Sequence, residues 1–180
     1  DAESSLPFLL FGDCQRFNKK TILAAVRLLQ QKMPISSQAI ADGLAHVVEL
    51  TGLKGRWQKL GDSPLIIADT GHNEAGIRLI VNQLSRLTYK TLRMVMGVVN
   101  DKDVHAMLSL LPKDATYYFT NAAIPRALPA SELQELAKNY DLIGKNYPSV
   151  QEALLAAKNE ASNDDVIFVG GSNFIVAEVV

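Results

Sequence analysis

The stretch LIIADTGHNEAGIRLI at residues 65–80 decides the fold of this chain. Its first four residues are an unbroken apolar run, which is typical of a strand buried on both faces. Residues 69–73 then form a polar loop, and from 74 to 87 the apolar residues recur at helical spacing. The positions predicted to share one face of this helix are Ile77, Ile80, Val81 and Leu84. A buried strand that runs directly into an amphipathic helix is the first half of a crossover between parallel strands.

The same alternation continues to the end of the chain. Strands are expected at residues 92–99, 116–120, 141–143 and 166–169, and helices at residues 104–111, 131–139 and 150–161. Strands that alternate with helices need crossover connections, and crossovers place helices over both faces of a sheet. The sequence therefore predicts an α/β fold: a Rossmann-like, mostly parallel sheet with helices on both faces.

Residues 1–54 follow a different, mostly helical pattern. The apolar run at 6–11 is expected to form a strand, and a helix is predicted over 18–32. The helix is expected to end before Pro34, because a residue before proline avoids the helical region. A second helix is predicted from a cap at Ser36 or Ser37 to Thr51-Gly52. The inward-facing positions expected in these two helices are Ile22, Ala25, Val26, Leu29, Ile40, Leu44, Val47 and Val48. These patterns divide the chain into a helical segment (1–54), a linker (55–63) and an α/β domain (64–180).

Composition excludes several classes of partner. The chain has 180 residues, 48% hydrophobic and 21% charged, with a net charge of -1 and no cluster of Lys and Arg. We therefore expect no nucleic acid and no anionic membrane as the main partner. The longest apolar runs are too short to cross a bilayer. With Cys14 as the single cysteine an internal disulfide is impossible, which favours the cytoplasm. The first residue is Asp1 rather than methionine, so we expect a fragment of a longer protein.

Polar loops follow the predicted strands at their carboxyl ends. In open parallel sheets the ligand site lies beyond those ends. The rule selects residues 69–73, 100–103, 121–126 and 170–172 as the functional rim.

Asp69 and His72 are the strongest candidates on this rim. A carboxylate at a strand end can accept hydrogen bonds from ribose hydroxyls, and a histidine nearby can donate to a phosphate or transfer a proton. Gly71 between them permits a tight turn. The alternative is a plain turn in which Asp69 and Asn73 cap the next helix. A structural metal is not expected, because no Cys or His pair has zinc-type spacing.

Arg56, in Gly55-Arg56-Trp57, is the second candidate. We expect it to reach freely from a linker across a cleft between domains, since a guanidinium suits phosphate oxygens. The alternative is a solvated surface arginine. The pair Gly170-Gly171 before Ser172 is a weaker anion site and more often a turn, because no lysine follows as in a Walker A motif. Asp103 is explained as a helix cap.

Taken together, these segments resemble the folylpolyglutamate synthase/dihydrofolate synthase branch of the Mur ligase superfamily, in order along nearly the whole chain. The helix that begins near Gln15 and Asn18 resembles the end of the family's central ATPase domain. The other matching elements are LKGRW at 53–57, DTGHN at 69–73 for the family's DGAHN, DKD at 101–103, PRALP at 125–129 and GS at 171–172.

The resemblance implies an ATP-dependent ligase that phosphorylates a carboxylate and joins it to an amino acid amine. It implies that Asn18 lies near the adenine, that Arg56 and Asp69 contact ATP through phosphate and ribose, and that His72 lies near the phosphate end. It implies that Ser172 lies on the glutamate side of the site. The expected substrates are ATP, L-glutamate and a folate or dihydropteroate, with Mg²⁺ as the metal.

The chain departs from the family pattern in one motif. The chain has no GxxxxGK[S/T] phosphate loop, so the triphosphate cradle and the magnesium ligands are expected in a missing upstream ATPase domain. We therefore expect the chain alone to be inactive. The alternatives are a domain of a peptidoglycan-precursor Mur ligase, a non-catalytic nucleotide-binding module and, more weakly, a dehydrogenase domain, which the absence of a glycine fingerprint disfavours.

Overall fold

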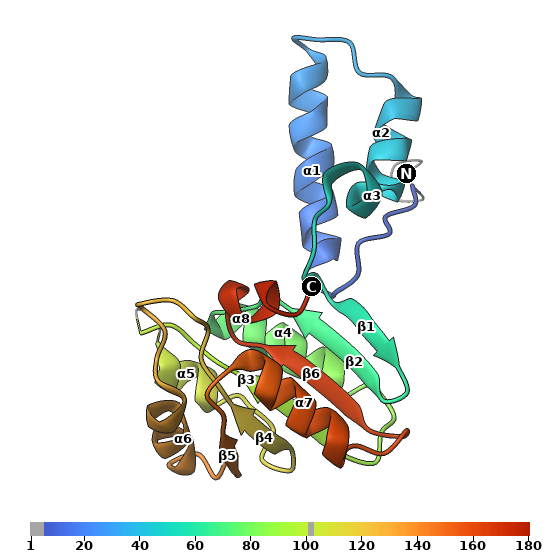
Figure 1. The fold of residues 1–180 in the computed structure, drawn as a ribbon. Coiled ribbons are helices and arrows are strands. Elements are labelled where there is room, and N and C mark those ends of the chain that lie inside the picture. The colour runs from blue at the N-terminus through green and yellow to red at the C-terminus, as the bar shows by residue number, and fades with distance from the viewer. Residues whose placement is uncertain (1–5, 101–102) are drawn as a thin grey trace.

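The computed structural model describes residues 6–100 and 103–180. Figure 1 shows two layers of different character: a helical segment at the amino-terminal end, and below it a twisted sheet with helices in front and behind. The sheet contains β1 (Gln58–Asp62), β2 (Leu65–Asp69), β3 (Leu92–Met96), β4 (Thr116–Phe119), β5 (Gly144–Asn146) and β6 (Val166–Gly170). Its strand order is β1-β2-β6-β3-β4-β5. All neighbours pair in parallel except β1, which is antiparallel to β2, so the predicted mostly parallel sheet is confirmed.

The sheet has a separate apolar core on each face. Side chains alternate along a strand, so Ile67, Met94 and Phe168 pack on one face while Val95 and Ile167 pack on the other. The helices that belong to the sheet are α4 (Glu74–Leu84), α5 (Val104–Leu108), α6 (Ala130–Lys138), α7 (Val150–Glu160) and α8 (Asn173–Ala177). The first three contribute to the first core, and α7 and α8 contribute to the second. Helices on both faces are therefore confirmed.

The segment 55–63 is not the linker that the sequence predicts. Its residues Gln58–Asp62 form β1, an edge strand that makes a hairpin with β2. The sequence hides this strand because a short, polar edge strand lacks the apolar alternation of a buried one. The predicted strand at 141–143 is also displaced: Asp141 lies in a turn with a φ of 59°, and β5 starts at Gly144.

The helical segment consists of α1 (Gln15–Gln30), α2 (Ser37–Ala45) and α3 (Val47–Thr51). The Ser36 hydroxyl accepts the Ala39 N–H, which confirms the predicted cap. The prediction of a single second helix is wrong, because the helix is interrupted at His46, between α2 and α3. The prediction of a strand at 6–11 is also wrong: these residues form no strand and pair with none in the described part of the chain. An apolar run forms a strand only where a neighbour offers backbone partners.

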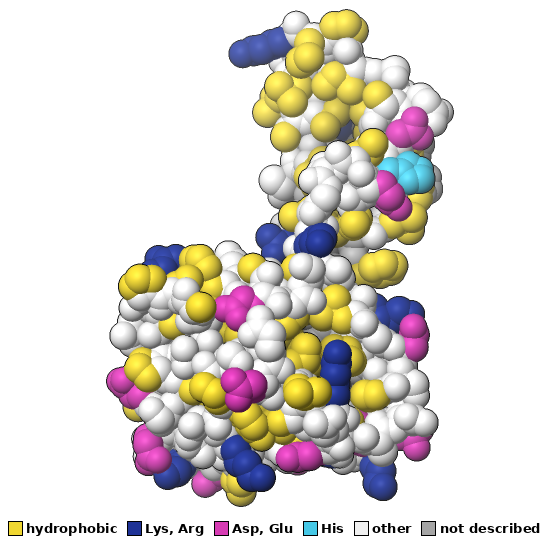
Figure 2. Space-filling view, in the orientation of Figure 1, with side chains coloured by type: hydrophobic (Ala, Val, Ile, Leu, Met, Phe, Trp, Pro, Cys, Tyr) yellow, Lys and Arg dark blue, Asp and Glu magenta, His cyan; other side chains and the backbone are white. Residues whose placement is uncertain are grey.

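The predicted inward faces of these helices are largely uncovered. Among the residues of α1 only Gln15 is buried, and Ile22 and Leu29 are 39% and 48% exposed. In α2 the predicted burial of Leu44 is confirmed, whereas Val48 in α3 is 44% exposed. Figure 2 shows the resulting apolar side chains on the surface of this segment. None of the helices across residues 6–100 and 103–180 combines the length and apolarity that spanning a membrane requires.

A charged cluster stabilises the end of the sheet opposite the predicted rim. Arg93 of β3 donates to the buried Asp165 carboxylate at 3.0 Å and to the Tyr118 hydroxyl at 2.7 Å. Burial opposes the charged form of Asp165, but the Ser162 N–H and hydroxyl and the Arg93 guanidinium outweigh it, so the pKa of Asp165 lies below its ordinary value. Burial and the hydrogen bond to Glu160 raise the pKa of Tyr118 to about 12. The cluster joins β3, β4, α7 and the start of β6.

Replacing Arg93 by Met should lower the free energy of unfolding by about 3–5 kcal/mol, because it leaves the Asp165 carboxylate buried without its cation. Urea denaturation measures the change. Lys113→Met is the matched control, since Lys113 and Asp141 form an exposed pair at 2.8 Å that should contribute less than about 1 kcal/mol. Equal losses in the two variants would contradict the structural role given to Arg93.

Candidate functional site

A polar cleft of about 360 Å³ lies where the carboxyl end of β2 faces the start of α1. Four of the five predicted site residues line it: Asn18, Arg56, Asp69 and His72. They come from α1, from the turn before β1, from the last position of β2 and from the loop between β2 and α4. Ser172 does not line the cleft, although its neighbour Asn173 does. The structure therefore brings together residues that are more than fifty positions apart in the sequence.

Asp69 is the buried member of this group, with 7% of its surface exposed. Its Oδ2 accepts the Trp57 N–H at 2.7 Å and its Oδ1 accepts the Gly71 N–H at 2.8 Å. Burial raises the pKa of Asp69, and the two amides and the Arg56 charge oppose that shift without cancelling it. The carboxylate thus connects the turn before β1 to the loop after β2.

Arg56 projects from a clamped turn rather than from a free linker, which corrects the expectation from sequence. Gly55 and Trp57 on either side of it have left-handed φ values of 70° and 48°. The Gly55 carbonyl accepts the Thr70 N–H at 3.0 Å, and the Gly55 N–H donates to the Gln58 side chain at 2.8 Å. A Cβ at Gly55 would lie 2.7 Å from the Val176 Cγ1 atom, so only glycine fits there. The backbone of Arg56 is therefore held while its side chain lines the cleft.

His72 is oriented by its own loop. Its Nδ1 lies 2.9 Å from the Thr70 carbonyl oxygen, and because a carbonyl only accepts, Nδ1 carries the proton of this bond. The other ring nitrogen, Nε2, is then the atom available to a ligand in the cleft. Asn73 behaves as the alternative interpretation predicted, since its side chain accepts the Gly76 N–H at 2.8 Å and caps α4.

Ser172 lies at the carboxyl end of β6, the strand beside β2. It is 4% exposed, and its hydroxyl accepts the Phe174 N–H at 3.2 Å, which starts α8. In this structure it is a helix cap behind the cleft.

The start of α1 forms the opposite wall of the cleft. Asn18 is exposed there and donates to the Gln15 side chain at 2.9 Å. The Asp13 N–H donates to the Gln83 side chain of α4 at 2.8 Å, and Arg86 pairs with the Asp13 carboxylate. Sequence reasoning missed Asp13 and Gln83, because no local pattern reports a contact across 70 positions.

Cys14 also lines the cleft, and its thiol is unsuited to nucleophilic attack. Burial and the nearby Asp69 charge raise the pKa of Cys14. The thiolate is the reactive form of cysteine, and a raised pKa reduces it.

Among the described residues, the other parts of the predicted rim do not line this cleft. Asp101 and Lys102 of the DKD element lie outside the described residues, and Asp103 caps α5 by accepting the Ala106 N–H at 3.0 Å. The loop at 121–129 packs against α8, where the Arg126 guanidinium lies 4.9 Å from the centre of the Phe174 ring. Within residues 6–100 and 103–180, no group of three or more His, Cys, Asp or Glu side chains could hold a metal ion.

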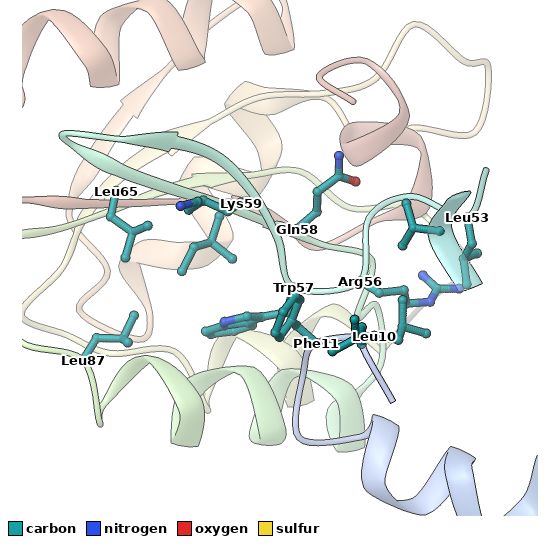
Figure 3. Close-up of a pocket in the computed structure, with 12 residues that line it drawn as sticks. Leu10, Phe11, Leu53, Arg56, Trp57, Gln58, Lys59, Leu65 and Leu87 are labelled. Carbon is teal, nitrogen blue, oxygen red and sulfur yellow. The ribbon is translucent and has the colours of Figure 1, made fainter. Parts of the chain in front are cut away.

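A larger hollow of about 530 Å³, drawn in Figure 3, shares Arg56 and Trp57 with this cleft. Its walls are mainly apolar, with Phe11, Leu65 and Leu87 among them. We assign the functional site to the smaller cleft, because it contains the buried carboxylate, the histidine and the carboxyl end of β2.

Comparison with known proteins agrees with this geometry. A family model described as Mur ligase, glutamate ligase domain, matches residues 55–173. The chain is 30% identical to a folylpolyglutamate synthase of Lacticaseibacillus casei, over 93% of this chain and 38% of that protein. It is 31% identical to a dihydrofolate synthase/folylpolyglutamate synthase of Escherichia coli K12, over 100% of this chain and 41% of that protein.

A solved structure shares the fold as well. It is the bifunctional folylpolyglutamate synthase/dihydrofolate synthase of Yersinia pestis, in complex with AMPPNP and a Mn ion. The TM-score is 0.78 at 30% identity, over 97% of this chain and 40% of that one. The chain therefore spans about two fifths of the length of the proteins that it matches.

Gly55 and Gly52 both have left-handed φ values, but replacing them by alanine should lower the free energy of unfolding by different amounts. Gly55→Ala should lower the free energy of unfolding by about 2–5 kcal/mol, because a left-handed alanine is strained and its Cβ also overpacks against Val176 and Thr70. Gly52→Ala is the matched control: its φ is 67° but nothing lies within 4 Å of its Cβ position, so strain of about 1–2 kcal/mol should be the whole effect. Thermal or urea unfolding measures both, and similar losses would rule out the close contact.

Proposed function

This chain belongs to the Mur ligase family, of which it carries the glutamate ligase domain, and from that premise we propose that it is the carboxyl-terminal part of a folate-glutamylating ligase. The parent enzyme uses ATP to phosphorylate the carboxylate of a folate or dihydropteroate. The amine of L-glutamate then attacks the acyl phosphate, and an amide, ADP and phosphate are released. The names of the relatives support this choice of substrates, and the Mur family supports the type of reaction.

The observation that carries the proposal is the cleft that gathers Asn18, Arg56, Asp69 and His72. Phosphoryl transfer depends mainly on positioning and on neutralising charge. Arg56 has a planar fork that suits phosphate oxygens, and the Nε2 atom of His72 can donate to a phosphate when that ring is protonated. We assign Asn18 to the adenine side, Asp69 to the ribose side and Ser172 to the glutamate side of the parent's site.

The parts of the site that this chain lacks are assigned to an upstream ATPase domain. The sequence holds no GxxxxGK[S/T] phosphate loop, and the described residues hold no metal-binding cluster. Mg²⁺ would be held by ligands of that domain and would supply charge neutralisation during phosphoryl transfer. A chain with half of the cleft makes only part of the contacts to ATP, so we propose that it is inactive alone.

The uncovered faces of α1–α3 support the predicted boundary after residue 54, while residues 55–63, predicted as a linker before the domain at 64–180, contain β1 and belong to the sheet. Most of the large apolar side chains that are exposed belong to residues 9–53. Short helices are marginal in water unless an apolar face packs against a partner. We propose that the upstream domain covers this face, and that residues 1–54 are the tail of that domain. We place the parent in the cytoplasm, where ATP is available and the lone Cys14 stays reduced.

Arg56→Ala in the parent enzyme should lower the rate of ATP-dependent glutamate ligation by about 10³-fold, the scale expected for an arginine that stabilises phosphoryl transfer. Arg56→Lys should recover little, because an ammonium lacks the bidentate fork. Arg78→Ala is the control, since Arg78 pairs with Glu74 on the exposed side of α4. Ligation is assayed with dihydropteroate and with a reduced folate. A parent that acts only on peptidoglycan precursors, or that binds ATP without turnover, would contradict the folate assignment.

Leu29→Lys tests the proposed interface. In the isolated chain the free energy of unfolding should change by less than about 0.5 kcal/mol, because Leu29 is already 48% exposed. In the parent the loss should be about 1.5–3 kcal/mol, since the substitution places a charge against buried apolar surface. Leu155→Lys on α7, 58% exposed, should be neutral in both proteins. Equal stability of the parent with and without Leu29→Lys would show that nothing covers this face.

A further inference from the structure

Asn18, the site residue on the far wall of the cleft, takes its position from residues 12–15. Its Nδ2 atom donates to the Gln15 side chain at 2.9 Å, and the Gln15 N–H donates to the Gly12 carbonyl at 3.0 Å. Gln15 is 3% exposed and is the first residue of α1, so Asn18 lies about one turn further along the same face of that helix. The place at which residues 12–15 contact the sheet domain therefore decides where Asn18 lies.

Helix α4 holds this segment through both polar groups of one residue. The Asp13 N–H donates to the Gln83 Oε1 atom at 2.8 Å, and the Asp13 carboxylate pairs with the Arg86 guanidinium. Gln83 lies in the last turn of α4, and Arg86 lies just after the end of that helix. The two side chains belong to the sheet domain, whereas Asp13 belongs to the helical segment. These three residues are named the Asp13 contact.

The backbone at Gly12 makes a second close approach to the sheet domain. Gly12 has a φ of 107°, and a Cβ placed there would lie 3.4 Å from the Trp57 Cβ atom and 3.9 Å from the Asp69 Oδ2 atom. Burial of the helices contributes little, since of the described residues in α1–α3 Gln15 and Leu44 alone are buried. The orientation of the helical segment on the sheet domain therefore depends strongly on contacts of residues 12–15.

We propose that Gln83 and Arg86 are positioning residues, which hold Asp13 and with it the start of α1, so that Asn18 stays on the same cleft as Asp69. The ion pair is partly exposed, with Asp13 and Arg86 side chains 22% and 58% exposed, and such pairs add little to stability. Loss of the Asp13 contact should therefore change the orientation of α1 more than the unfolding of the chain. The consequence for the parent enzyme rests on the function proposed above, whereas the Asp13 contact belongs to this chain alone.

Residual dipolar couplings of the ¹⁵N-labelled chain, aligned in a neutral stretched gel, test the Asp13 contact without any activity. In the wild type the amide couplings of α1 and of the sheet strands should fit one alignment tensor, because the two parts are held together. In the double variant Gln83→Ala/Arg86→Ala the α1 couplings should become smaller and need a tensor of their own. Arg78→Ala is the matched control, since Arg78 is also on α4 but pairs with Glu74. Two tensors in the wild type, or one in the double variant, would overturn the proposal.

Salt separates the two halves of the Asp13 contact and needs only the single variants, which decides the question even if the double variant fails to fold. Raising the salt concentration from about 0.1 M to about 1 M shortens the Debye length from about 10 Å to about 3 Å. In Gln83→Ala only the ion pair remains, so the α1 couplings should fall further at high salt. In Arg86→Ala only the neutral hydrogen bond remains, so salt should have no effect. An equal response of the two variants would contradict the assigned roles.

In the parent enzyme the double variant should raise the KM for ATP by about 3–10-fold with kcat nearly unchanged, the loss expected when one or two hydrogen bonds to the adenine are misplaced. In an Asn18→Ala background the same double substitution should have a much smaller effect, because the side chain that it positions is already gone. Equal fold-changes in the two backgrounds would show that the Asp13 contact does not act through Asn18, and the proposal would be wrong. A parent without ligase activity would refute the proposed function, while the dipolar couplings would still decide whether Gln83 and Arg86 orient α1.

Discussion

Parallel pairing of β2 with β6 is the constraint on which the site depends. Parallel strands need crossover connections, and crossovers bring the carboxyl ends of all such strands to one edge of the sheet. Asp69 and Gly170 are partners in this register, so the loops that follow them leave the sheet side by side. Asp69 is thus the last residue of a strand that is hydrogen-bonded on both sides, and the turn that carries Arg56 is tied to it.

The pKa of a buried carboxylate is shifted in opposite directions at the two ends of the sheet. At the amino ends of β3 and β6, Asp165 lies against the Arg93 guanidinium and accepts hydrogen bonds from Ser162, so burial is outweighed and its pKa falls. At the carboxyl end of β2, Asp69 has two amides and a more distant cation, so burial prevails and its pKa rises. The first environment stabilises the fold, while the second leaves a carboxylate that is sensitive to the groups placed near it.

The helical segment differs from the sheet in how little of its apolar surface is buried. Its sequence is amphipathic in the way that a helix of a packed domain is, yet only Gln15 of α1 and Leu44 of α2 are buried. Among its firmest links to the sheet are the contacts of residues 12–15 around the cleft, including the bond between Asp13 and Gln83. The site is therefore assembled at a junction, where a few polar contacts rather than an apolar core set the relation between two parts.

What the sequence by itself determined is the part of the molecule that local patterns encode. The apolar run at 65–68 and the helical spacing after Glu74 predict β2 and α4, and Asp69 and His72 follow as rim residues because strand ends carry ligand sites. These local patterns do not predict secondary structure correctly where it depends on a segment that is distant in the sequence. Gln58–Asp62 becomes a strand only because β2 offers it backbone partners, and residues 6–11 form none because no described strand lies beside them.

Only the tertiary structure decided that Arg56 lies between two residues with left-handed φ values and that the Asp69 carboxylate accepts two backbone N–H groups. It also separated Ser172 from the cleft that the other four residues share. The physical reason for the first two is that the bonds of Trp57 to Asp69 and of Thr70 to Gly55 join separate segments of the chain, and such bonds leave no periodic trace in the sequence.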